Sequence, residues 1–107
     1  MWEENLKRYD QLVSKCPRFD RKGKTMPYTS ANGHMFSLLN KAGELGIRFS
    51  KEQQHKYIAE WSSDIFKSYN SIMRGYVMIP EEMFQDLDQL AIYLNESYDY
   101  VMSLNPK

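Results

Sequence analysis

Residues 25–40 read TMPYTSANGHMFSLLN, and this stretch carries the most definite structural signal in the chain. Asn32 and Gly33 stand between two runs of aromatic, aliphatic and hydroxyl side chains. An Asn-Gly pair favours the type I′ turn, in which both central residues take positive φ and the turn follows the twist of the flanking strands. The stretch therefore predicts a β-hairpin with strands at 25–31 and 34–40.

The turn also predicts which residues of the two strands face each other. Counting outward from it places Thr29 opposite Phe36 and Tyr28 opposite Ser37. Pro27 has no backbone N–H to donate, so the first strand is expected at an edge of the sheet or with a bulge near its start.

A third strand follows the hairpin. Residues 41–44 form a second turn, and in residues 45–49 the apolar Leu45, Ile47 and Phe49 alternate with Gly and Arg. This alternation predicts a strand with one apolar face, and hence a three-stranded antiparallel meander.

Amphipathic helices are expected on both sides of the meander. In residues 2–16 the apolar side chains recur at the helical period, at Trp2, Leu6, Tyr9, Val13 and Cys16. Pro17 ends that helix because it lacks an N–H donor. Ser50 and Gln53 have the spacing of a capping box, so a second helix begins there, with apolar positions at Tyr57, Ile58, Trp61 and Ile65.

The remaining residues predict one more strand and a long helix. Residues 72–79 are rich in β-branched and aromatic side chains, which favour a strand. Residues 80–82, Pro-Glu-Glu, suit a helix start, and Asp86 with Gln89 forms a further capping pair. The order α-β-β-β-α-β-α predicts a two-layer α+β fold, an antiparallel sheet with flanking helices.

Length and composition limit the class of protein. The 107 residues, 42% hydrophobic and 26% charged, predict a single packed domain over residues 1–107. The lone cysteine excludes an internal disulfide. No apolar run approaches the ~20 residues needed to span a bilayer, and the N-terminus does not have the apolar core of a signal peptide. We therefore expect a small cytoplasmic domain with no membrane partner.

Charge is divided unevenly along the chain. Residues 1–56 carry 11 basic and 6 acidic side chains, whereas residues 57–107 carry 3 basic and 8 acidic ones. The formal net charge of zero excludes a protein that binds nucleic acid with its whole surface. Two interpretations stay open: the two segments pack against each other within one domain, or they create a polarised surface that docks on a partner or on a second copy.

The only dense basic run is residues 18–24. Its candidate contact patch for phosphate or carboxylate groups comprises Arg18, Arg21, Lys22 and Lys24. The same composition is typical of a solvated connection. Because Phe19 is the only aromatic residue among these cations, any nucleic-acid contact is expected to be weak and non-specific.

No assembled catalytic, cofactor or metal site is recognisable. Cys16 lies on an apolar helical stripe, where a buried thiol is commoner than a reactive one. His34 and His55 have no neighbours at metal-ligand spacing. The carboxylates of residues 81–88 are explained by helix capping. The sequence thus predicts no enzyme, no cofactor and no metal.

Aromatic residues suggest an interface instead. Tyr93, Tyr98 and Tyr100 cannot all face one core, because helical spacing spreads them around the axis. At least one is therefore expected to be exposed. With Trp2 they form the candidate interface for a homodimer or an unknown protein partner.

Three blocks of sequence carry a family resemblance: residues 22–28, residues 32–39 with 45–49, and residues 76–82 followed by Asp88-Gln89-Leu90. Together they resemble the TfoX N-terminal domain family, in which a strand of the form Gly-x-Met-Phe is matched here by Gly33-His34-Met35-Phe36. Pro27-Tyr28-Thr29-Ser30 departs from the Gly-rich step that is frequent in the family.

The resemblance implies an α+β domain with no catalytic residues to transfer. The second, helical domain of the competence regulators in that family has no counterpart in these residues. We therefore expect a small regulatory or protein-interaction domain without catalytic activity. The alternative is a nucleic-acid-associated transcriptional regulator that acts through the basic run.

Overall fold

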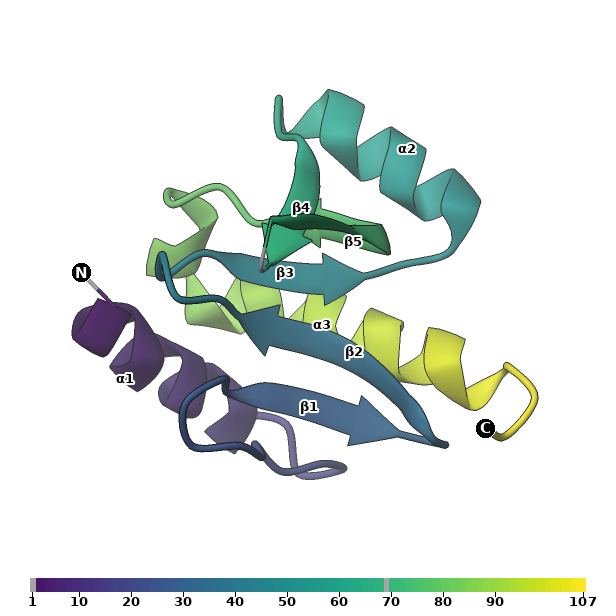
Figure 1. Cartoon of the computed structure of the whole chain (residues 1–107), viewed down its shortest axis with the longest axis horizontal. Coiled ribbons are helices and arrows are strands. Elements are labelled where there is room, and N and C mark those ends of the chain that lie inside the picture. Colours follow the sequence, from purple (N-terminus) through teal and green to yellow (C-terminus); the bar gives the residue numbers. More distant parts are fainter. Residues whose placement is uncertain (1, 69) are drawn as a thin grey trace.

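The chain folds around one antiparallel sheet (Figure 1). A computed structural model describes residues 2–68 and 70–107. Its elements are α1 (Trp2–Ser14), β1 (Tyr28–Ala31), β2 (His34–Leu39), β3 (Leu45–Arg48), α2 (Lys51–Glu60), β4 (Ile65–Ser68), β5 (Ser71–Met78), the 3₁₀ turn η1 (Met83–Gln85) and α3 (Leu87–Met102). The strands are arranged in the order β1-β2-β3-β5-β4. The predicted α+β class and order of elements are confirmed, with one strand added.

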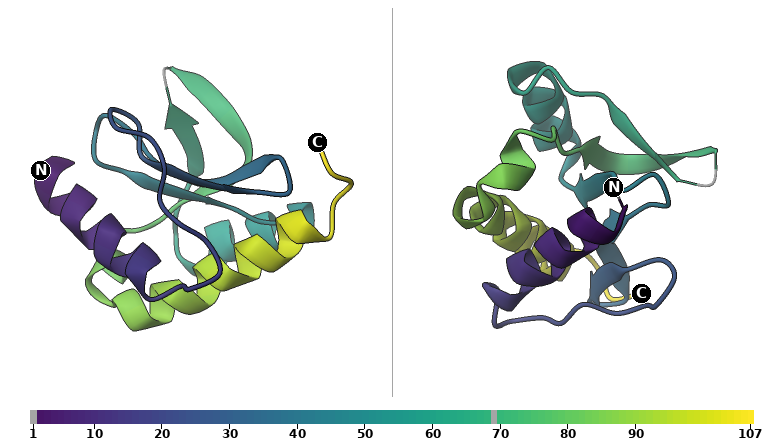
Figure 2. Two further views of the ribbon diagram at one scale, coloured as in Figure 1. Left: turned by 90° about the horizontal axis from the view of Figure 1, so that it is seen from below. Right: turned by 90° about the vertical axis from the view of Figure 1, so that its left-hand side faces the viewer.

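Two helices cover one face of this sheet. Helices α1 and α3 lie together against it, whereas β4 and β5 extend away from them (Figure 2). Helix α2 packs beside β5, and its Tyr57 hydroxyl donates to the Glu96 carboxylate of α3. The main core between sheet and helices is built from fully buried side chains that include Leu12, Phe36, Leu39, Ile47, Val77, Leu90 and Leu94.

The predicted hairpin is confirmed at its turn. Asn32 and Gly33 have φ of 57° and 80°, as a type I′ turn requires. Strand β1 lies at the sheet edge, which agrees with the expectation drawn from Pro27.

The predicted register beyond the turn is wrong by one residue. Thr29 pairs with Ser37 and Tyr28 with Leu38, because β2 contains a bulge at Phe36. A bulge sets two residues of one strand against one of its neighbour, so consecutive side chains can lie on the same face. Here Phe36 enters the core and Ser37 also points to α1, where its Oγ lies 2.6 Å from the Tyr9 hydroxyl.

The added strand, β4, begins at Ile65, which the apolar pattern assigns to the second helix. Helix α2 ends at Glu60, and Ser62 adopts a positive φ of 50°, which an α-helix does not accept. The Ser63 N–H then bonds to the carbonyl of Ile58, and the chain turns into β4. Ile65 consequently pairs with Val77 of β5 instead of continuing the helix.

Both predicted helix caps are present. The Ser50 hydroxyl accepts from the Gln53 N–H at 3.3 Å, and Asp86 accepts from the Gln89 N–H at 3.2 Å. The Pro-Glu-Glu segment at 80–82, however, leads into η1 and not directly into α3. The reason is that the short turn buries Phe84 against the core before α3 begins.

Candidate functional site

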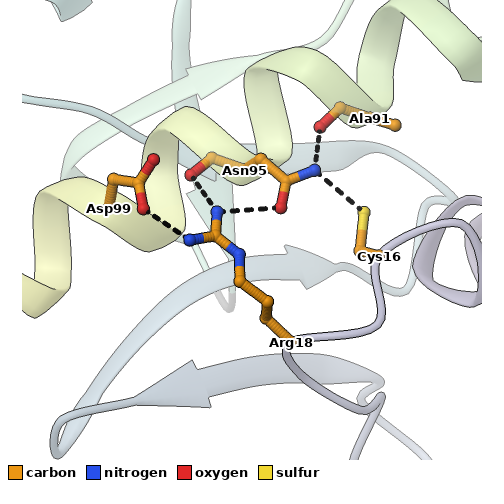
Figure 3. Close-up of polar contacts among 5 residues, drawn as sticks. All are labelled: Cys16, Arg18, Ala91, Asn95 and Asp99. Carbon is orange, nitrogen blue, oxygen red and sulfur yellow. Dashed lines mark hydrogen bonds and ion pairs between the residues drawn. The ribbon is translucent and has the colours of Figure 1, made fainter.

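The first arginine of the basic run is bound to α3 (Figure 3). The Arg18 guanidinium donates to an Asp99 carboxylate oxygen at 2.8 Å and to the Asn95 side-chain oxygen at 3.0 Å. It also lies 4.4 Å from the centre of the Tyr98 ring. The hydrogen bond to Asp99 raises the pKa of Arg18 above its ordinary value. Arg18 therefore joins the segment after α1 to α3.

A second arginine of the run is paired as well. Arg21 donates to both carboxylate oxygens of Asp10, from Nε to Oδ1 at 2.7 Å and from Nη2 to Oδ2 at 3.2 Å. Lys22 and Lys24 are exposed and form no ion pair with the residues that the structure describes. Of the predicted basic patch, only these two lysines remain available to an outside anion without breaking an internal pair.

Two ion pairs connect the basic and acidic parts of the chain. Lys15 lies 2.9 Å from Asp88, and Arg18 contacts Asp99. In both pairs the cation comes from residues 1–56 and the carboxylate from α3. The geometry thus favours packing within the chain as the explanation of the charge asymmetry.

Cys16 has the surroundings of a structural thiol. The residue is 1% exposed, and its Sγ accepts from the Asn95 amide at 3.6 Å (Figure 3). Burial raises the pKa of the Cys16 thiol above its usual value. A protonated, enclosed thiol is a poor nucleophile.

The tyrosines of α3 take part in internal contacts. Tyr93 meets Tyr57 and Trp61 edge to face, while Tyr98 stacks on Phe19 at 5.3 Å. Tyr93, Tyr98 and Tyr100 are all half-buried, as is Trp2, so the expectation that at least one of the three tyrosines is exposed is wrong. The physical reason is that aromatic rings cover Tyr93 and Tyr98, whereas the Arg48 guanidinium lies over the ring of Tyr100.

Helix α3 exposes an apolar side chain that the pattern of aromatic residues did not indicate. This residue is Ile92, whose side chain is 68% exposed.

The titratable residues that the structure describes do not gather into a metal site. Among residues 2–68 and 70–107, no group of three or more His, Cys, Asp or Glu side chains could hold a metal ion. The ring of His34 hydrogen-bonds through Nε2 to the carbonyl of Asn105 at 2.9 Å. No helix in the described part of the chain is long and apolar enough to cross a membrane.

The second face of the sheet is apolar and largely open. Leu38, Phe66 and Tyr76 are buried there in a small cluster separate from the main core. Around them lies a pocket of about 440 Å³. We call its lining the methionine face: Met26, Tyr28, Met35, Leu38, Ser68, Ser71 and Met73.

The β4–β5 hairpin contributes Ser68, Ser71 and Met73 to this lining, and β1 and β2 contribute Tyr28, Met35 and Leu38. The hairpin can bend over the sheet because Gly46 of β3 has no side chain, and the ring of Phe66 occupies the space where its Cβ would be. The Tyr76 hydroxyl donates to the carbonyl of Met35 at 2.8 Å and joins β5 to β2. Burial raises the pKa of Tyr76.

One polar atom of the pocket has no partner within the described part of the chain. Ser68 is 9% exposed, and its buried Oγ forms no hydrogen bond with residues 2–68 or 70–107. A buried hydroxyl without a partner costs free energy, so this atom favours a ligand that supplies a donor or an acceptor.

Sequence reasoning missed the methionine face. A signal was present, since four of the seven methionines stand on or beside strands, at 26, 35, 73 and 78. Their common face depends on the bulge at Phe36, which a simple count from the hairpin turn does not include.

No protein-family model matches the chain, and no curated protein is significantly similar to it.

Proposed function

We propose that the chain is a small cytoplasmic regulatory domain without catalytic activity, which binds an apolar segment of a partner protein on its methionine face. One observation carries the proposal: the sheet face opposite α1 and α3 holds an open apolar pocket with a single buried, unpaired hydroxyl. An apolar pocket with one well-placed polar group is the common form of a binding site.

The side chains of the pocket suit a peptide. Methionine is unbranched and polarisable, so it adapts to apolar groups of different shape. Met26, Met35 and Met73 are half-buried around the pocket, each with part of its surface accessible. The Ser68 hydroxyl offers one hydrogen bond to a backbone group of an entering segment.

Charge around the pocket favours acidic residues beside the apolar ones in the partner. Lys22 pairs with Tyr28 across an antiparallel bridge, so both side chains lie on the same face. The exposed Lys24 follows two residues later.

A second copy of the chain fits this face less well. In a two-fold dimer each surface meets its own equivalent. Lys22 and Lys24 of one copy would then approach the same lysines of the other, and like charges that face each other oppose association.

The proposal is tested by peptide selection against the folded chain. We expect selected peptides to carry apolar residues flanked by Asp or Glu. Binding should weaken at least tenfold in Met73→Lys, because the new charge enters the apolar pocket. The matched control is Ile92→Lys, an exposed apolar position on α3, where binding should not change. Peptides that bind Met73→Lys as well as the unchanged chain would contradict the proposal.

Self-association is measured in the same series. Light scattering over a range of concentration and salt would reveal a dimer. Loss of that dimer in Met73→Lys would assign the methionine face to a second copy. A dimer that depends instead on Trp2, Tyr93, Tyr98 or Tyr100 and weakens with salt would support the candidate interface derived from the aromatic residues.

The basic run provides less support for the nucleic-acid alternative. Arg18 and Arg21 would have to leave Asp99 and Asp10 before they could contact phosphate. Membership of the TfoX N-terminal domain family likewise stays a proposal; it concerns the fold and assigns no residue of this site.

A further inference from the structure

Strand β5 separates two cavities. Its residues alternate between the two faces of the hairpin, so Ser71 and Met73 line the methionine face, whereas Ile72 and Arg74 line a second cavity of about 450 Å³. We call the second cavity the cationic cleft, after the basic residues that line it: Arg48, Lys51, His55 and Arg74.

The charge of this cleft is unbalanced. Arg48, Lys51 and Arg74 are cations at neutral pH. No Asp or Glu is among the described residues that line the cleft, and none of the three cations forms an ion pair within the described chain. The arginines of the basic run, by contrast, are bound to carboxylates. Three like charges around one cavity repel one another, and an anion in the cavity would relieve that repulsion.

The backbone positions Arg48 at the cleft. Gly75 has a φ of 83°, and the Arg48 side chain passes 3.5 Å from the place that a Cβ on Gly75 would occupy. The Arg48 guanidinium lies 5.7 Å from the centre of the Tyr100 ring. Lys51 is the first residue of α2, so the positive end of the helix dipole adds to the same field.

We infer that the cationic cleft binds the phosphate group of a small phosphomonoester whose organic part is apolar or aromatic. A doubly charged phosphate matches a cavity lined by three cations, one each from β3, α2 and β5. Ile72, 59% exposed at the cleft, provides an apolar contact for the organic part. The Tyr100 hydroxyl makes no hydrogen bond within the described residues and remains a donor for a ligand oxygen.

The arrangement favours a compact ligand over a nucleic acid. A nucleic-acid strand is held by basic residues that follow its backbone over several nucleotides. Here the cations surround one cavity, and Arg18 and Arg21, which could extend the surface, are engaged elsewhere.

The test is an NMR titration of the full chain with phenyl phosphate at low salt. We expect saturable shifts of the backbone signals of Arg48, Lys51, Ile72 and Arg74. Inorganic phosphate, which lacks the ring, and phenyl sulfate, which carries one negative charge, should each bind more weakly. Lys51→Gln and Arg74→Gln should each weaken phenyl phosphate binding about tenfold, since each removes a charged hydrogen bond. Both positions are exposed, so the fold should persist.

Lys24→Gln is the matched control, because Lys24 is an exposed lysine that does not line the cleft. The inference is overturned if the signal shifts caused by phenyl phosphate do not saturate. It is also overturned if Lys24→Gln weakens binding as much as Arg74→Gln does. Equal affinity for inorganic phosphate would show that the organic part of the ligand does not contribute to binding. Tighter binding of a short oligonucleotide at the same residues would assign the cleft to nucleic acid. Met73→Lys should leave the titration unchanged, so this inference and the proposed function can fail separately.

Discussion

The hydroxyl of Tyr9 in α1 lies 2.6 Å from the Oγ of Ser37 in β2, with both side chains fully buried. Ser37 also shares a hydrogen bond with Thr29 of β1. This polar chain links the first helix to the bulge of β2, and each hydroxyl in it has a partner. Removal of one of these hydroxyl groups is therefore expected to weaken the hydrogen bonds of the others.

Stability should fall in alkaline solution. Burial is the main cause that raises the pKa of Tyr9, and burial likewise raises the pKa of Tyr57 and Tyr76. In the unfolded chain these tyrosines lose their proton near pH 10. The unfolded state then binds fewer protons than the folded one, so the free energy of unfolding is unaffected below about pH 10 and decreases above it.

Urea unfolding measured between pH 8 and pH 11 checks this dependence. Tyr9→Phe should cost about 1–2 kcal/mol at neutral pH, because it breaks the buried hydrogen bond. It should also reduce the alkaline decline. An unchanged decline would show that Tyr9 does not titrate differently in the two states.

Gly33→Val should be strongly destabilising. Gly33 has a φ of 80°, which a β-branched residue resists. The loss of unfolding free energy should be at least about 1–2 kcal/mol. Gly33→Asn is the matched control: its Cβ would approach the carbonyl of Lys107 equally, but Asn tolerates positive φ. Equal stability of the two variants in denaturant melts would contradict the turn assignment.

Gly46→Ala should destabilise the sheet through its contact with Phe66. The added methyl group would overlap the Phe66 ring, and overpacking of this kind costs about 1–3 kcal/mol. In the background of Phe66→Leu, which removes the ring, the same change should cost less. Additive losses in the double variant would mean that the two residues do not share this space.

Duplex DNA should bind weakly, with steep dependence on salt and no preference for sequence. The combined change Asp10→Asn and Asp99→Asn frees Arg21 and Arg18 and raises the net charge. Affinity measured by fluorescence anisotropy at low salt should then increase. Tight, sequence-selective binding by the unchanged chain would favour the transcriptional alternative instead.

Features fixed by neighbours in sequence could be predicted from the sequence. The turn at Asn32 and Gly33 depends on the φ values that these two residues accept. The caps at Ser50 and Asp86 depend on a side chain three residues from its partner N–H. Each requires only local geometry, and each is present in the structure.

Features that depend on distant partners could not be predicted. The bulge at Phe36 places Ser37 beside Tyr9, which is far away in the sequence. Strand β4 exists because β5 pairs with it. The methionine face and the cationic cleft combine residues from several strands and helices, so no single segment indicates either of them.

The side chain of Asn32 donates to the carbonyls of both Val101 and Leu104, at 2.9 Å each. The end of α3 is thus capped from two sides, by the N–H groups of Ser103 and Leu104 and by a side chain of the hairpin turn. Opening of the turn therefore removes two hydrogen bonds from the end of α3, and fraying of that helix leaves the Asn32 amide unsatisfied. In hydrogen exchange, the two segments should behave as one cooperative unit despite their distance along the chain.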